Sequence, residues 1–261
     1  MVASIDKILE AMTHSSIPPI IGQPTYSSIH EIHQYLSSNA ASIQSNLGCG
    51  TLGLIYLTLS PTVYATLLDT LFVPPPNPGA TAKIHSTTTA SQTSSIRRAH
   101  DESQEIFKEY DNTNKALKKV LIGAVDDIFL RAIRDCYVGY ANITTRPMFT
   151  HLYTTYANIT PADIIKNDAR LKTAYNVNQP IKRLFEQIED AIEYVDAGHN
   201  PYTPLQVFTN AFQLVFQTGM FVQDCKYWNR TTPDDKTWKK LQYLLCHCPP
   251  RMARVASHHV R

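Results

Sequence analysis

The residues best suited to metal chemistry lie close to the C-terminal end of the sequence: Cys246, His247, Cys248, His258 and His259. Thiolate and imidazole are the usual ligands of zinc, and a zinc knuckle spaces them as C-x2-C-x4-H-x4-C so that short turns bring four ligands around the ion. Here one residue separates the two cysteines, and the histidine pair follows far beyond them. This spacing fits neither a knuckle nor a finger, so we predict no metal site.

Paired carboxylates offer a second kind of chemistry, and Asp126-Asp127 stands near Arg131 and Arg134. Adjacent residues on a helix point about 100° apart, so these two carboxylates would not share one site. We expect instead a solvated face with an ion pair between Asp127 and Arg131. The sequence contains no nucleophile elbow and no H-E-x-x-H motif. The glycines of 46–53 do not form a phosphate loop, because no Lys-Ser/Thr pair follows them. We therefore predict no catalytic residue and no cofactor.

Basic residues gather in three places. Arg97-Arg98 and the group Lys115, Lys118 and Lys119 give modest positive patches within predicted helices. The C-terminal tail carries the third group, Arg251, Arg254 and Arg261. Such patches are common on helical surfaces, yet a basic tail after a helical body is also what an RNA-packaging protein carries. Both interpretations stay open, and the three tail arginines are the residues that we expect to contact RNA.

Length and composition favour an ordinary globular protein. The 261 residues are long enough for one large core or two small ones, and the formal net charge of +2 requires no nucleic-acid or membrane partner. Five scattered cysteines fit a reducing compartment better than a disulfide framework. The N-terminus does not read as a signal peptide, and no stretch is long enough to span a membrane. We expect a cytoplasmic protein.

The elements that position these residues read as amphipathic helices. In 180–197 the apolar residues fall at helical spacing, Pro180 suits a first turn, and Gly198 is expected to close the helix in the left-handed conformation. Thr160-Pro161, Thr203-Pro204 and Thr232-Pro233 each place a hydroxyl at the N-cap and proline at the first helical position. The remaining helices are expected at 5–12, 27–44, 61–71, 95–110, 112–136, 145–156, 161–173, 204–217, 220–229 and 233–246.

Four segments are expected to lie outside the packed helices. Residues 1–24 read as a poorly anchored flexible arm, and 73–94 as a linker rich in proline, threonine and serine. Residues 54–59 fit strand or helix equally well. The tail 247–261 is basic and is expected to be disordered.

The order of motifs over 96–156 resembles a known family. An aromatic-bearing helix with Phe107, a long helix with Ala116-Leu117, a loop with Thr144-Thr145 and a helix with Leu152 follow one another. This succession resembles the Gag polyprotein of copia-type LTR retrotransposons, and 162–171, 181–195 and 205–216 continue the family's order. The wording of the blocks that begin PTYSSIHEIH and NQPIKRLFEQ looks like the Gag-like proteins of such elements in diatoms and other protists. The resemblance covers about residues 25–245.

The resemblance implies an all-α, capsid-like multi-helix bundle with two helical portions, 25–156 and 157–246. It also implies a structural function, in which copies of the chain form a shell around element RNA, with no membrane partner. We expect self-association through exposed aromatic residues of the C-terminal portion, Phe221, Tyr227 and Trp228; core packing is the alternative for each. The sequence departs from the family after Leu245, where neither the zinc knuckle nor the enzymes of a full polyprotein follow. A monomeric helical adaptor, or a domesticated Gag remnant, remains the competing interpretation, and an enzyme the third class.

Overall fold

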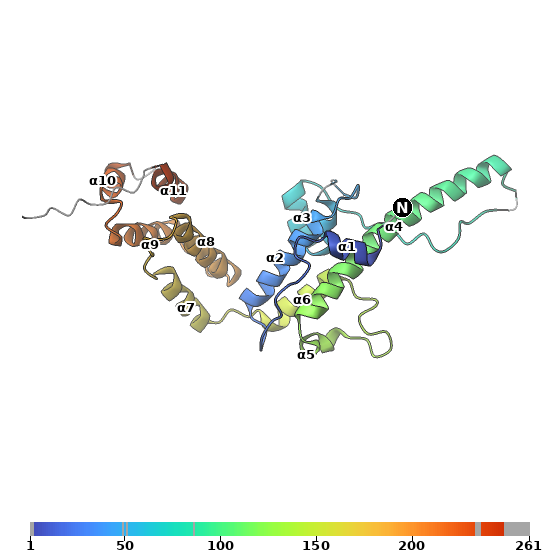
Figure 1. The fold of residues 1–261 in the computed structure, drawn as a ribbon, viewed down its shortest axis with the longest axis horizontal. Coiled ribbons are helices and arrows are strands. Elements are labelled where there is room, and N and C mark those ends of the chain that lie inside the picture. Colours follow the sequence, from blue (N-terminus) through green and yellow to red (C-terminus); the bar gives the residue numbers. More distant parts are fainter. Residues whose placement is uncertain (1–2, 49, 51, 86, 233–235, 248–261) are drawn as a thin grey trace, which may run out of the picture. The chain divides into compact units, whose positions relative to one another are not determined.

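The computed structural model describes residues 3–48, 50, 52–85, 87–232 and 236–247. Within them the chain is all-α: eleven α-helices and two short 3₁₀ helices, with a single isolated bridge between Asp135 and Gly139 in place of a sheet. The chain divides into two compact units, residues 1–158 and 159–261. Figure 1 shows the helices of each unit.

The first unit contains the helices that precede residue 158. They are α1 (Ile5–Ala11), α2 (Tyr26–Ser42), the 3₁₀ helix η1 (Gly53–Leu57), α3 (Pro61–Leu68), α4 (Ala90–Ala124), α5 (Asp127–Leu130), the 3₁₀ helix η2 (Arg131–Ile133) and α6 (Thr145–Tyr156). Its core forms where α2, α6 and the C-terminal half of α4 pack around Leu36, Leu117 and Leu152. The segment 54–59, left open between strand and helix, is thus mostly 3₁₀ helix.

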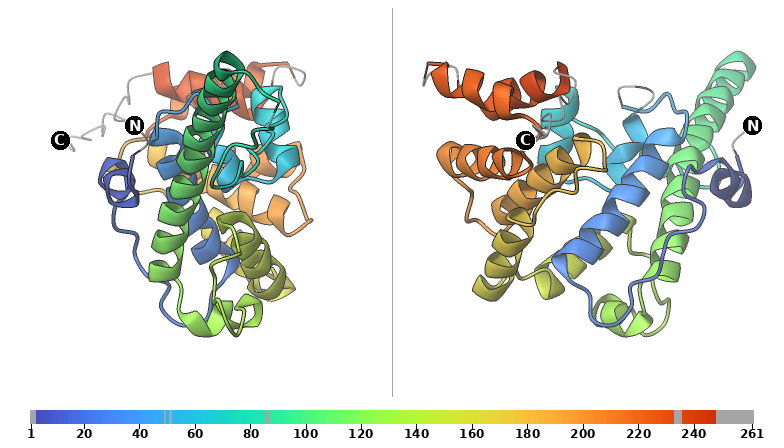
Figure 2. Two further views of the ribbon diagram at one scale, coloured as in Figure 1. Left: turned by 90° about the vertical axis from the view of Figure 1, so that its right-hand side faces the viewer. Right: turned by 60° about the vertical axis from the view of Figure 1, so that its left-hand side comes forward.

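Helix α4 is a single rod of 35 residues, where we predicted a linker to residue 94 and two separate helices. Nothing at Asp111 breaks the chain, so the two predicted helices merge. The helix begins earlier than expected because Thr89 and Gln92 form a capping box that the sequence already contained. Its N-terminal half, residues 90–108, is mostly exposed and projects from the unit (Figures 1 and 2).

The N-terminal residues form part of the first core, so the expectation of a poorly anchored arm is wrong for them. Ile8, Met12 and Ile17 are buried in the same cluster as α2 and α4. The backbone N–H of Ile20 donates to the carbonyl of Ala124 at 2.8 Å, and Asn39 exchanges two hydrogen bonds with the backbone of His14. Ile17 and Ile20, on either side of the Pro18-Pro19 pair, thus contact the core as well.

The predicted helix 112–136 ends at Ala124, and the acidic pair after it plays a different part from the one expected. Asp126 caps α5 by accepting from the backbone N–H of Ile128 at 3.0 Å. Asp127 pairs with Arg134 at 3.2 Å, not with Arg131, because the helical spacing that would join Asp127 to Arg131 is interrupted by η2. Short polar side chains that bond to nearby backbone favour such helix boundaries.

The second unit contains α7 (Pro161–Leu171), α8 (Lys182–Ala197), α9 (Pro204–Gln217), α10 (Val222–Arg230) and α11 (Trp238–His247). Thr160 and Thr203 form capping boxes with the third residue of α7 and α9, which confirms these two predicted starts. Pro233, in the third predicted start, lies outside the described residues. The core gathers around Leu184, Ile188, Leu214 and Leu241.

The end of α8 differs from the prediction. Gly198 has φ −80°, and the left-handed conformation belongs to His199, with φ 54°. Gly198 is instead a position of close approach, because an added Cβ would lie 3.1 Å from Cγ2 of Ile159. The absence of a side chain at Gly198, and not a positive φ, lets the segment before α7 pass the end of α8.

Candidate self-association surfaces

The structure separates the three aromatic residues that we expected at a self-association surface. Phe221 and Trp228 are buried in the second core, so the prediction that they are exposed is wrong for both. The ring of Trp228 packs at 5.9 Å from that of Phe208, between α10 and α9. Only Tyr227 faces solvent, with 65% of its surface exposed. A buried tryptophan that touches its own unit is unavailable to a second copy.

A different apolar surface follows helix α9. We call Leu205, Phe208, Phe212 and Phe216 the α9 ladder. Consecutive phenylalanine rings of the ladder have centroids 6.0 and 6.1 Å apart. Phe208 and Phe212 are half-buried, whereas Leu205 is 72% and Phe216 58% exposed. The ladder is therefore an ordered row of large apolar side chains whose outer edge meets solvent.

The geometry of α9 explains why these side chains remain outside the core. At about 100° per residue, the four ladder positions fall within an arc of about 80°. Val207, Ala211 and Leu214, which are buried, occupy the neighbouring arc. The helix is thus apolar over more than the face that one core can cover, which is typical of a helix with a second partner. That excess was visible in the sequence PLQVFTNAFQLVF and was the signal we missed.

The first unit has its own exposed apolar row, on α3. We call Val63, Leu67 and Leu71 the α3 stripe; Val63 and Leu67 lie on the helix and Leu71 just beyond its end. All three are more than half exposed, and Leu71 reaches 75%. Tyr64 and Leu68 are the other large apolar residues of α3. Only Tyr64 is fully buried, because it points about 100° away from Val63, into a small aromatic cluster with Tyr56 and Phe72.

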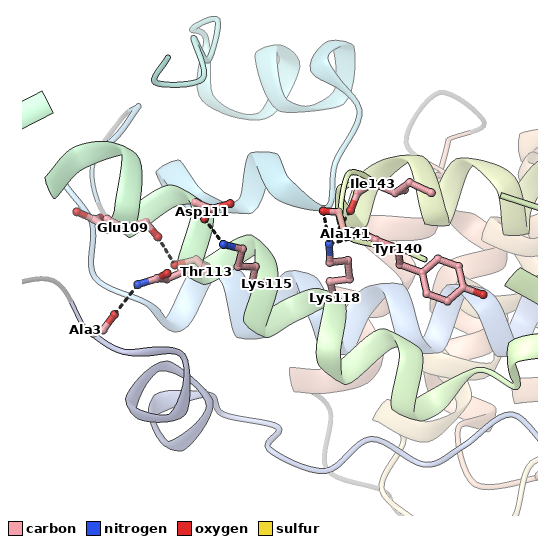
Figure 3. A network of polar contacts seen from close by, with 10 residues as sticks. Ala3, Glu109, Asp111, Thr113, Lys115, Lys118, Tyr140, Ala141 and Ile143 are labelled. Atoms are coloured by element: carbon pink, nitrogen blue, oxygen red, sulfur yellow. Dashed lines mark hydrogen bonds and ion pairs between the residues drawn. The ribbon is translucent and has the colours of Figure 1, made fainter. Parts of the chain in front are cut away.

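The buried lysine of α4 is the most unusual polar group in the first unit (Figure 3). The Nζ of Lys118 donates to the carbonyls of Tyr140, Ala141 and Ile143 at 2.7, 3.1 and 3.0 Å. Burial lowers the pKa of this ammonium group. All three of its donors are used by backbone, so Lys118 fastens the loop before α6 to α4 and is not placed as a nucleophile or base.

A second polar contact joins α2, η1 and α6 through His33. One ring nitrogen lies 3.1 Å from the carbonyl of Thr58 and the other 3.1 Å from the hydroxyl of Tyr153. A neutral ring satisfies both contacts when Nε2–H donates to Thr58 and Nδ1 accepts from Tyr153. Desolvation by burial lowers the pKa of His33. Both contacts lie within the packed unit, so this histidine has a structural role.

The positive patch expected on α4 is largely neutralised. Lys118 is buried, Lys115 pairs with Asp111 at 2.6 Å, and Lys119 lies 4.0 Å from Asp6. Arg97 and Arg98 are exposed on the projecting half of α4. The tail arginines expected to contact RNA, Arg251, Arg254 and Arg261, lie outside the described residues. In the helical body, Arg97-Arg98 is therefore the more open of the two basic patches that we predicted.

The described residues contain no group of three or more His, Cys, Asp or Glu side chains arranged to hold a metal ion. Of the metal-chemistry residues, Cys246 and His247 lie at the end of α11, and Cys248, His258 and His259 lie outside the described part. Among the residues that the structure describes, no helix is long and apolar enough to cross a membrane. A cleft of about 430 Å³ in the second unit is lined mainly by apolar side chains, with Lys182 as its charged residue.

Comparison with known proteins adds no assignment. No protein-family model, no curated protein and no solved structure matches the chain.

Proposed function

We propose that this chain is a non-catalytic structural protein, as the resemblance to copia-type Gag implies, and that its copies associate through the α9 ladder and the α3 stripe. The observation that supports the proposal is the presence of one exposed apolar row on each of two compact helical units. Full burial of one leucine or phenylalanine side chain stabilises a contact by about 1.5–3 kcal/mol. Association itself costs about 4–15 kcal/mol in lost translational and rotational freedom, so each row on its own would give only a weak pairwise contact.

The size of the assembly depends more on the number of apolar rows than on the strength of either one. A chain with one self-complementary surface closes into a dimer, because the same patch is used up on both copies. A chain with two different self-complementary surfaces can join a new copy at each, so association continues beyond the dimer. Repetition of weak contacts then supplies the avidity of a large assembly. A shell of the capsid type is one product of such growth.

We further propose that the RNA, if enclosed, is held mainly by the basic tail, since Lys118 of α4 is buried and Lys115 and Lys119 pair with carboxylates. Binding through Arg251, Arg254 and Arg261 would weaken as salt is raised, because released counterions drive such binding. A chain ending at His247 tests this: it should lose salt-sensitive binding to a single-stranded RNA yet keep its self-association. Equal RNA binding by both chains would contradict the assignment to the tail.

The experiment for self-association is light scattering after size-exclusion chromatography, with negative-stain imaging, at rising protein concentration. We define the ladder variant as Leu205→Ser with Phe216→Ser, and the stripe variant as Leu67→Ser with Leu71→Ser. The wild-type chain should increase in mass with concentration and form large particles. Ile165→Ser and Ile128→Ser remove isolated exposed isoleucines from each unit and serve as matched controls. A wild-type monomer at every concentration would favour the helical adaptor instead.

A further inference from the structure

The segment that joins α3 to α4 contains an unusual sequence for a connector. Residues 72–79 read FVPPPNPG, with prolines at 74, 75, 76 and 78. The proline ring fixes φ near −65°, and a residue before proline is restricted to extended conformations. Val73, Pro74 and Pro75 each precede a proline, and the described chain contains no cis peptide bond. This segment is therefore held in an extended, polyproline II-like backbone before any partner is met.

Two of the three edges of this segment face solvent. Polyproline II has three residues per turn, so residues three apart share an edge. Pro75 and Pro78 share the half-buried edge, whereas Val73 and Pro76 share an exposed one, and so do Pro74 and Asn77. Val73 is 80% exposed. The half-buried and exposed residues thus repeat every three positions, as the three-residue turn of polyproline II requires.

The N-terminal end of the segment is fixed by aromatic packing. Phe72 is buried, and its ring stacks on that of Tyr56 with centroids 4.3 Å apart. The rings of Tyr64 and Tyr110 lie 5.6 and 6.1 Å from it. The residues on either side, Leu71 and Val73, point outward and are exposed.

The C-terminal end is fixed by a side chain from the projecting half of α4. The Nε2 of Gln104 donates to the carbonyls of Gly79 and Ala80 at 2.9 and 3.2 Å. The Oδ1 of Asn77 accepts from the N–H of Gly79 at 2.9 Å, and Gly79 has φ 81°, which favours glycine. With both ends fixed, the prolines between them are held in place, and the segment ends beside the projecting half of α4 (Figure 1).

We propose that residues 73–78 are a docking site for a proline-recognition domain of another protein, one whose groove is lined by aromatic side chains. Such grooves bind preformed polyproline II segments, which lose little conformational entropy on binding. No Asp, Glu, Lys or Arg occurs between Thr70 and Ala82, so recognition rests on apolar and ring contacts and not on charge. The fixed ends add to this, because a segment already ordered needs less ordering by the partner.

The test uses the full chain and a panel of purified SH3, WW and EVH1 domains, with binding measured by biolayer interferometry. At least one domain should bind saturably. The double variant Pro74→Ala with Pro76→Ala should lower the affinity of that domain for the chain by about tenfold or more. Pro18→Ala with Pro19→Ala changes an exposed proline pair elsewhere in the unit and should leave binding within about twofold. Circular dichroism of each variant shows whether the helices persist.

Two further arms separate a displayed segment from a merely proline-rich one. A free peptide of residues 71–80 should bind the same domain several-fold more weakly than the full chain does. The substitution Gln104→Ala should lower the affinity of the full chain toward that of the peptide. The proposal is overturned if none of the domains binds saturably. So does equal binding by the wild type and the Pro74/Pro76 variant with its helices intact. A peptide that binds as well as the full chain would overturn the role given to Gln104 and Phe72.

Discussion

The two units bury different kinds of side chain. In the part of the chain that the structure describes, the second unit buries one polar residue, Asn167, and the first unit buries six polar or charged residues: Asn39, Thr58, Thr113, Asn114, Lys118 and Thr145. This difference in buried polar residues arises from the backbone of each unit. The first unit contains irregular stretches around η1 and between α5 and α6, and their carbonyls and N–H groups need partners from side chains. In the second unit, local capping boxes satisfy the starts of α7 and α9, and the side chain of Gln187 donates to carbonyls at the end of α7.

The second unit should therefore depend mainly on apolar packing, and the first also on a few long-range hydrogen bonds. Each unit can then be damaged by a different kind of substitution. Hydrogen exchange, followed separately in peptides of each unit, distinguishes the two because local stability is reported element by element.

The largest effect is expected from Ile188→Ala, since this side chain of α8 is fully buried in the second core. Removing it should destabilise the second unit by about 3–4 kcal/mol, through lost burial and the cavity left behind. Denaturant unfolding, with hydrogen exchange of α8 and α11, measures this. Exchange in α4 and α6 should change far less. Equal loss of protection in both units would contradict their independence.

Lys118→Met should destabilise the first unit by about 2–3 kcal/mol, because methionine keeps the volume yet leaves three carbonyls without a donor. Lys115→Met is the matched control on the same helix. Its ammonium group is half-exposed in an ion pair with Asp111, which contributes about 0.5 kcal/mol or less. If the two substitutions cost the same, the loop before α6 does not depend on Lys118.

A pair of asparagines sharpens the comparison further. Asn114 Oδ1 accepts from the backbone N–H of Thr145 at 3.0 Å, at the start of α6, where the helix itself supplies no partner. Asn167 donates to the carbonyl of Ala191 at 2.9 Å, inside α8, where the helical ladder provides another donor. Asn114→Ala should therefore cost about 1–3 kcal/mol, and Asn167→Ala about 1 kcal/mol. The reverse order in chemical denaturation would contradict this account.

The smallest effect is expected on acidification. The folded-state pKa of His33 lies below the unfolded value of 6.5, so the unfolded chain takes up the proton first as pH falls. The stability of the first unit due to neutral His33 is complete above pH 6.5 and is lost as pH falls through that value toward the folded pKa. His33→Gln should flatten this part of the pH dependence, measured as the denaturation midpoint between pH 7.5 and 5. An unchanged slope would remove His33 as the cause.

Local signals predicted much of the fold, and long-range contacts account for what they missed. Thr160 and Thr203 predicted helix starts correctly because a capping box is made within four residues. Lys118 reads as a surface charge on periodicity, and only the loop some 20 residues later shows why it is buried. The inward placement of Ile8 and Met12 depends likewise on α4, far along the chain.

The candidate surface was harder to predict than the fold. Phe221 and Trp228 are aromatic residues in short helices, and composition does not tell a core residue from a surface residue there. The sequence of α9 already shows an excess of apolar residues, but the buried arc of Val207, Ala211 and Leu214 decides which of them form the ladder. The tail arginines and Pro233 lie beyond the described residues, so the assignments made for them stay predictions.

Sedimentation velocity of the ladder variant and the stripe variant beside the wild type tests the central claim most directly. If each unit supplies one self-complementary surface, either variant keeps a single surface and should stop at a dimer, whereas the wild type continues to larger species as its concentration rises. Combining both sets of substitutions should give a monomer. Growth of either variant beyond the dimer, with its helices intact by circular dichroism, would contradict the account, as would a wild type that stops at two copies.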